Sequence, residues 1–149
     1  MQILPLPPYA PHSPESLLPV NTFTLWSYTN FTDPRWRLGA RYITLRQDPA
    51  GFKAQKLGVR VADGWAAYSF KDHLFVKRFA WDPAALYPDF NCNFEVYTNP
   101  DILELESLAP LVELPPGKTV THWEEWTVFD GIPAPQSEED VDRTILPLV

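Results

Sequence analysis

Two glutamates, Glu104 and Glu106, have the residue type and spacing that acid–base chemistry needs. They are two positions apart in Leu103–Leu108, an alternating run that predicts a β-strand. Both would lie on one face, about 6.6 Å apart, with the leucines on the other face. In a groove, repulsion and desolvation would keep one carboxyl protonated beside an ionised one, as proton transfer at a sugar carbon requires. On an open face they would be two solvated acids. We take Glu106 and Glu104 as the catalytic candidates.

His122 and Glu124 form a second pair two residues apart, within the run Thr119–Phe129. The spacing suits a proton-transfer pair, a contact to a bound sugar, or two ligands of a metal ion. A third ligand has no candidate, so we expect neither a metal nor another cofactor, and His122 can equally serve as a structural hydrogen-bonding group.

Aromatic side chains gather in the segment 26–36, where Arg35 and Arg37 flank one of them. Stacked rings and guanidinium planes suit a sugar, whose C–H groups are apolar and whose hydroxyls need donors. The alternative is that these rings fill the core. The candidate substrate-binding residues are Trp36, Arg35, Trp26, His122 and Glu124.

The elements that must position these residues are strands. The chain has 17 prolines and 6 glycines and lacks long helical patterns, which favours an all-β fold with many turns. Asp63-Gly64 between two strand-like runs predicts a hairpin. We predict an antiparallel β-sandwich with these strands: Phe23–Tyr28, Arg41–Gln47, Gly58–Val61, Trp65–Phe70, Leu74–Trp81, Phe94–Thr98, Leu103–Leu108 and Thr119–Phe129.

Three segments are expected. Residues 1–20 contain six prolines, which remove backbone donors, so this segment should wrap over the surface in extended form. Residues 21–130 form the β-sandwich domain. Residues 131–149 form an acidic tail with a short helix, because Ser137 followed by acidic residues is typical of a helix N-terminus.

Composition excludes several classes of function. The net charge is −7 and no basic stripe is present, so we expect no nucleic acid partner. A single cysteine, Cys92, excludes an internal disulfide, and it has no neighbours typical of a nucleophile. No apolar run is long enough to span a membrane, and the proline-rich start is unlike a signal peptide. We expect a cytoplasmic protein with no membrane partner.

One stretch resembles a known superfamily: FEVYTNPDILELESLAPLVELPPGKTVTHWEEWTVF. It is similar to the C-terminal part of galactose mutarotase-like (aldose 1-epimerase-like) β-supersandwich proteins, and most of all to an uncharacterised branch. The upstream segments LWSYTNFTDPRW, RYITLRQD, KLGVRVADGWAAY and LFVKRF resemble the same branch. The resemblance covers about residues 5 to 149, so the chain looks like the C-terminal half of a longer protein.

The resemblance implies a sugar ligand. Aldose 1-epimerases use a glutamate base and a histidine acid, and Glu106 is the nearest match to that glutamate. We predict a carbohydrate-binding protein whose ligand is a small sugar or an oligosaccharide. One alternative is a sugar-active enzyme, either epimerase-like or a glycosidase that uses the Glu104 and Glu106 pair. The other is a structural half-fold for assembly. A half-fold leaves sheet edges uncovered, so we expect a homo-oligomer, most simply a homodimer.

Overall fold

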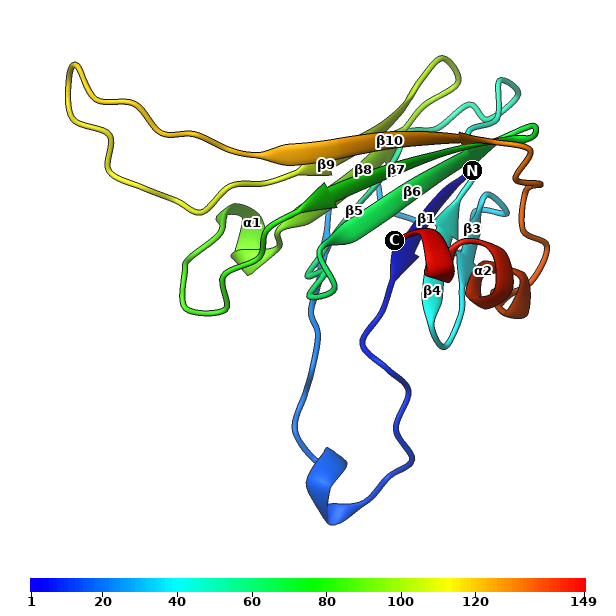
Figure 1. The fold of residues 1–149 in the computed structure, drawn as a ribbon, viewed down its shortest axis with the longest axis horizontal. Coiled ribbons are helices and arrows are strands. Elements are labelled where there is room, and N and C mark those ends of the chain that lie inside the picture. The colour runs from blue at the N-terminus through cyan, green and yellow to red at the C-terminus, as the bar shows by residue number, and fades with distance from the viewer.

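The computed structural model describes all residues from 1 to 149, and two antiparallel β-sheets dominate it (Figure 1). One sheet has six strands in the order β10-β7-β6-β1-β4-β3, and the other has four in the order β2-β5-β8-β9. The strands are β1 (Gln2–Pro5), β2 (Phe23–Leu25), β3 (Trp36–Leu38), β4 (Tyr42–Leu45), β5 (Gln55–Val59), β6 (Trp65–Phe70), β7 (His73–Phe79), β8 (Phe94–Thr98), β9 (Leu103–Ser107) and β10 (Glu124–Asp130). The predicted antiparallel all-β class is confirmed.

The helical elements are short: α1 (Pro88–Asn91), α2 (Glu138–Thr144), and the 3-10 turns Pro14–Ser16 and Leu146–Leu148. The predicted C-terminal helix is present as α2. Its N-cap is Ser137, whose hydroxyl accepts a hydrogen bond from the backbone N–H of Asp140 at 3.2 Å. This bond satisfies one of the free N–H groups at the helix start.

The main core lies between the two sheets, where alternate residues of each strand point inward. Phe79 of β7 stacks on Phe94 of β8 with ring centroids 5.1 Å apart. Further fully buried members come from strands of both sheets: Leu4, Ile43, Leu45 and Ala66 from one, and Leu57, Val59 and Val96 from the other. This packing fixes which face of each strand remains for function.

A second apolar cluster covers the opposite face of the six-stranded sheet. Val141 and Ile145 of the C-terminal segment pack there on Ile3, Trp65 and Val76. Arg41 anchors the same segment through ion pairs with the α2 carboxylates. The C-terminal tail is therefore packed against this face of the six-stranded sheet through α2.

The predicted strand boundaries match the structure best in two strands that have a neighbour on each side. Trp65–Phe70 and Phe94–Thr98 are confirmed as predicted. The predicted strand Thr119–Phe129 begins only at Glu124, because residues 108–123 form a long loop that projects from the sandwich (Figure 1). Those residues have no strand beside them to bond with.

The start of the chain differs from the expectation of a surface segment. Residues Gln2–Pro5 form β1, which lies between β6 and β4 in the six-stranded sheet and is buried throughout. The reason is the position of the prolines. Pro5 is the last residue of the strand, so Gln2, Ile3 and Leu4 keep their backbone donors. Within the N-terminal segment, the part that projects away from the sheets is the loop that follows β1 and reaches residue 22 (Figure 1).

Candidate functional site

The outer face of the four-stranded sheet collects charged and aromatic side chains. Lys56 lies on β5, Glu95 and Tyr97 on β8, and Glu104 and Glu106 on β9. The register pairs Glu95 with Glu106, and pairs Tyr97 with both Lys56 and Glu104. Since their strand neighbours point into the core, these five side chains share the outward face.

Lys56 is the centre of this face. Its Nζ lies 2.6 Å from Glu95 Oε2 and 3.2 Å from Glu106 Oε2. The same ammonium lies 4.9 Å from the ring centroid of Trp26, a cation–π distance. One cation thus bridges two carboxylates beside an indole ring. We call Lys56, Glu95, Glu106 and Trp26 the Lys56 cluster.

The protonation of the Lys56 cluster follows from its burial. Glu95 is only 3% exposed, and this burial raises the pKa of its carboxyl. A hydrogen bond from Lys56 acts to lower that pKa, and Asp89 acts to raise it further. Burial by itself lowers the pKa of Lys56, but hydrogen bonds to Glu95 and Glu106 outweigh this and raise it above its ordinary value. Lys56 therefore stays charged, and Glu95 is the group that can take up a proton.

The floor beneath the cluster is tightly packed around Gly58. A Cβ atom at Gly58 would lie 2.8 Å from Cys92 Sγ and 3.0 Å from Thr24 Cβ, so a side chain has no room there. Burial, followed by the nearby charge of Glu95, raises the pKa of Cys92 to about 12. The thiol is thus protonated at neutral pH and is no nucleophile.

A strained turn borders the same floor. Asp89, Phe90 and Asn91 have φ values of 48°, 59° and 71°, a left-handed conformation that is costly for residues with side chains. The hydroxyl of Thr24 on β2 donates to the carbonyl of Asp89 at 2.7 Å and holds the turn against the sheet. Phe90 is 88% exposed beside it.

A hollow adjoins the cluster through Tyr28. It has a volume of about 440 Å³ and is lined by Ser27, Tyr28, Thr29, Asn30, Lys53, Ala54 and Gln55. Burial raises the pKa of Tyr28, and Lys56, Tyr97 and Glu106 lie close enough to act on it electrostatically. Hydroxyl and amide groups thus continue the polar face beyond the cluster.

Another lysine, Lys77, is buried and connects the two sheets. Lys77 Nζ lies 3.0 Å from Glu124 Oε1 and donates to the carbonyl of Leu105 at 2.8 Å. Trp126 Nε1 donates to Glu124 Oε2 at 2.8 Å, and the Ser107 hydroxyl donates to Glu124 Oε1. We call Lys77, Glu124, Ser107 and Trp126 the Lys77 cluster.

The Lys77 cluster does not form a Ser-His-acid triad. His122 Nε2 lies 3.0 Å from Ser107 Oγ and 3.6 Å from Glu124 Oε1, so the acid approaches the nitrogen that faces the serine. In a triad the acid holds the other nitrogen. Burial acts to raise the pKa of Glu124, but hydrogen bonds from Ser107, Lys77 and Trp126 together lower it. The carboxylate is saturated with donors.

The sequence-predicted residues are thus divided among three places. Glu104, Glu106 and Trp26 lie together on the outer face of the four-stranded sheet. His122 and Glu124 lie together at the Lys77 cluster.

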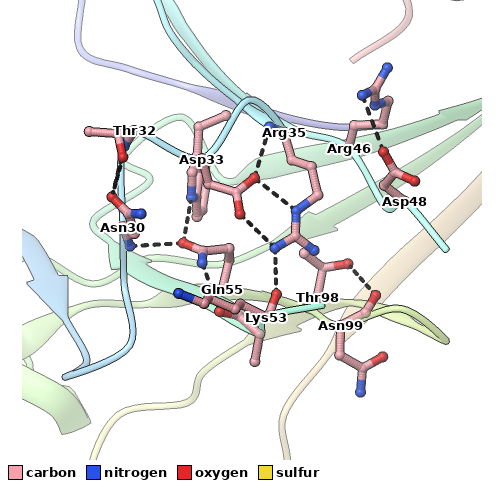
Figure 2. Close-up of polar contacts among 12 residues, drawn as sticks. Asn30, Thr32, Asp33, Arg35, Arg46, Asp48, Lys53, Gln55, Thr98 and Asn99 are labelled. Atoms are coloured by element: carbon pink, nitrogen blue, oxygen red, sulfur yellow. Dashed lines mark hydrogen bonds and ion pairs between the residues drawn. The ribbon is translucent and has the colours of Figure 1, made fainter. Parts of the chain in front are cut away.

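Trp36 and Arg35 lie in the interior, 6% and 4% exposed. Trp36 Nε1 donates to Gln55 Oε1 at 3.0 Å. The Arg35 guanidinium makes a two-pronged ion pair with Asp33 at 2.9 Å and also donates to the carbonyl of Lys53 (Figure 2). Neither plane is offered to solvent. The expected sugar contact of Trp36 and Arg35 therefore does not fit their placement. The Trp36 ring is packed in the apolar core, and the Arg35 guanidinium is paired with Asp33.

Sequence reasoning missed Lys56, Glu95 and Tyr97. Lys56 precedes the predicted strand Gly58–Val61, and Glu95 and Tyr97 are ordinary outward positions of a strand. Their signal was the alternation Glu95–Tyr97 opposite Glu104–Glu106, which needs the register of the hairpin to be interpreted.

No family model, curated protein or solved structure matches this chain. No group of three or more His, Cys, Asp or Glu side chains is arranged to hold a metal ion. None of the helices has the length and apolar character that crossing a membrane requires.

Proposed function

We propose that this protein binds a carbohydrate on the outer face of the four-stranded sheet. The observation that carries the proposal is the Lys56 cluster, in which one ammonium bridges two carboxylates beside Trp26. The resemblance of residues 94–129 to galactose mutarotase-like proteins supports the same ligand class. The cytoplasmic location expected from the sequence stays a prediction.

Sugar recognition needs both apolar surface and fixed polar groups. Rings of Trp26, Tyr28 and Tyr97 can pack on the C–H face of a pyranose. Carboxylates accept from sugar hydroxyls and the Lys56 ammonium donates to them, in geometries fixed by the sheet. The polar hollow beside Tyr28, about 440 Å³, has the size of a small-molecule site. The ligand class is therefore a monosaccharide or a short oligosaccharide.

The second candidate is a sugar-active enzyme, and the state of Glu95 favours it. Burial raises the pKa of Glu95, while Glu106 opposite it on β9 is ion-paired with Lys56. A glutamate whose pKa is raised, next to a second glutamate, is the kind of pair that epimerases and glycosidases use as acid and base. In this candidate the exposed Glu104 and the half-buried Glu106 can reach a sugar, and Glu95, which is 3% exposed, acts through the Lys56 ammonium that it shares with Glu106.

Ligand-observed NMR tests the binding proposal. A panel of neutral, acidic and amino monosaccharides with their oligomers should give saturation transfer from the protein to at least one sugar. Transfer to none of them would contradict the proposal. Polarimetry on freshly dissolved glucose and galactose, with aryl-glycoside turnover, tests the enzyme candidate. Binding without a rate above buffer would leave binding as the function.

A further inference from the structure

One long strand edge has no partner within the chain. β10 ends the six-stranded sheet and bonds only to β7, and it has seven residues. The other edge strands, β2, β3 and β9, have three, three and five residues. Lys77 bonds to a carbonyl of β9, and Arg37 ties β3 to Gln136. No bond outside the β7 ladder involves the backbone of β10.

The same strand exposes large apolar side chains. Trp126 and Val128 are each 65% exposed, and Trp123 just before the strand is 80% exposed. The apolar surface continues along the projecting loop of residues 108–123, which Figure 1 shows extending beyond both sheets. A long edge with free backbone groups and exposed apolar residues is a site of strand pairing.

A second copy of this chain fits the edge because β10 is complementary to itself in one antiparallel register. When the two-fold axis passes through Trp126, the two indoles face each other and no like charges are opposed. The remaining pairs are Glu125 with Thr127, Glu124 with Val128, Trp123 with Phe129, and His122 with Asp130. Aromatic pairs across strands are favourable, and an imidazole opposite a carboxylate can form a hydrogen bond.

Neighbouring registers are worse for electrostatic reasons. An axis through Thr127 sets Glu124 opposite Asp130, and an axis through Glu125 sets that carboxylate opposite its own copy. Like charges directly opposite each other destabilise a strand pair. A register centred on Val128 opposes no like charges either but sets Trp126 opposite Asp130, so the register centred on Trp126 is the one that also pairs the two indoles.

We propose that two copies of this chain pair through β10 in the register centred on Trp126 and join their six-stranded sheets into one continuous sheet. The contact is isologous, because each copy offers the same edge to the other. The β10 edge would then be the contact surface of the homodimer, and of the assembly role, that the sequence analysis expects. β10 belongs to the other sheet from the Lys56 cluster, so the proposal does not depend on sugar binding.

Light scattering coupled to gel filtration tests the association. The wild-type chain should elute at twice the chain mass of 17.1 kDa. Trp126→Lys places two ammonium groups on the axis and should give the single mass. Phe52→Lys changes a ring that is 97% exposed elsewhere and should keep the double mass. A wild-type monomer at tens of micromolar, or an equal loss of dimer in both variants, would overturn the proposal.

Disulfide trapping tests the register without changing Trp126. Glu125→Cys and Thr127→Cys should cross-link under mild oxidation when the two variants are mixed, because these positions face each other. Each variant by itself should stay largely unlinked, since like positions lie too far apart to bridge. The native Cys92 is buried and does not interfere. No cross-link in the mixture, or equal cross-linking of each variant with itself, would contradict this register.

Discussion

The molecule holds two lysines paired with glutamate, the half-buried Lys56 and the buried Lys77, and the two pairs differ in how the carboxylates are hydrogen-bonded. At the Lys77 cluster one glutamate receives three side-chain donors, Lys77, Ser107 and Trp126, and these lower its pKa. At the Lys56 cluster one lysine serves two glutamates, and burial raises the pKa of Glu95. In the Lys77 cluster every donor meets the single carboxylate, whereas in the Lys56 cluster two carboxylates share one ammonium.

This difference separates a structural contact from the proposed binding site. The Lys77 cluster links strands of both sheets, because Lys77 on β7 bonds to the carbonyl of Leu105 on β9. Its polar atoms are engaged and leave little for a ligand. The Lys56 cluster links strands of one sheet only and faces outward. Its spare carboxylate oxygens and aromatic rings can meet hydroxyls and C–H groups of a sugar.

The largest effect is expected from Lys77→Met. The Lys77 and Glu124 side chains are 8% and 20% exposed, so Glu124 would keep a poorly solvated charge without its cation. We expect the free energy of unfolding to fall by about 3 kcal/mol in urea denaturation at neutral pH. The double variant Lys77→Met/Glu124→Leu should recover much of the loss, because it removes both charges. A loss below about 1 kcal/mol would show that the cluster is not a structural contact.

Lys56→Met should have a smaller effect that depends on pH. Burial already raises the pKa of Glu95, and loss of Lys56 should raise it further, so Glu95 can take up a proton rather than stay as a buried charge. A raised folded pKa gives stability that is present below the unfolded value, about 4.3, and is lost as pH rises through the folded pKa. We expect almost no loss at pH 5 and about 1–2 kcal/mol at pH 8, from urea melts. Equal losses at both pH values would contradict the assignment.

Glu95→Gln should leave the protein as stable as wild type or raise its stability by up to about 1 kcal/mol at pH 8. The amide keeps an acceptor for Lys56 and removes the cost of burying a charge. Below the unfolded carboxyl pKa the variant and wild type should be equally stable, since Glu95 is then protonated in both states. Thermal melts across pH 4 to 8 would detect the difference. A variant that is less stable at every pH would mean that the charge of Glu95 itself holds the fold.

Glu106→Gln should have the smallest effect on stability, below about 0.5 kcal/mol, because the side chain is 31% exposed and Glu95 keeps Lys56 paired. It should still weaken sugar binding, since it keeps the shape and removes a carboxylate acceptor from the face. Urea melts and a sugar titration on the same sample measure both. Unchanged affinity would remove Glu106 from the site.

The sequence predicted the fold better where periodicity alone decides the structure. Phe94–Thr98 alternates clearly and Trp65–Phe70 begins directly after the Asp63-Gly64 turn; both strands have a neighbour on each side, and their predicted limits are correct. The proline content of residues 1–20 does not predict β1, because the first proline, Pro5, is the last residue of the strand. The loop 108–123 was partly misassigned because extended alternation does not say whether a partner strand lies beside it.

The candidate site was only half predictable. Glu104 and Glu106 were recognised because their spacing lies within one strand. Glu95 and Lys56 come from two other strands, and only the register brings them to Glu106. Trp26 and Trp36 have the same residue type in the same segment, yet one faces Lys56 and the other fills the core. Residue type and spacing do not distinguish those two fates; burial does.

Saturation transfer measured on matched tryptophan variants tests the central claim most directly. Trp26→Ala removes the ring beside Lys56, and Trp123→Ala removes a ring that is 80% exposed near β10. With the best sugar of the panel, wild type and Trp123→Ala should transfer equally, and Trp26→Ala should lose most of the signal while its thermal melt shows a folded protein. Full transfer in folded Trp26→Ala, or loss of transfer in Trp123→Ala, would contradict a sugar site at the Lys56 cluster.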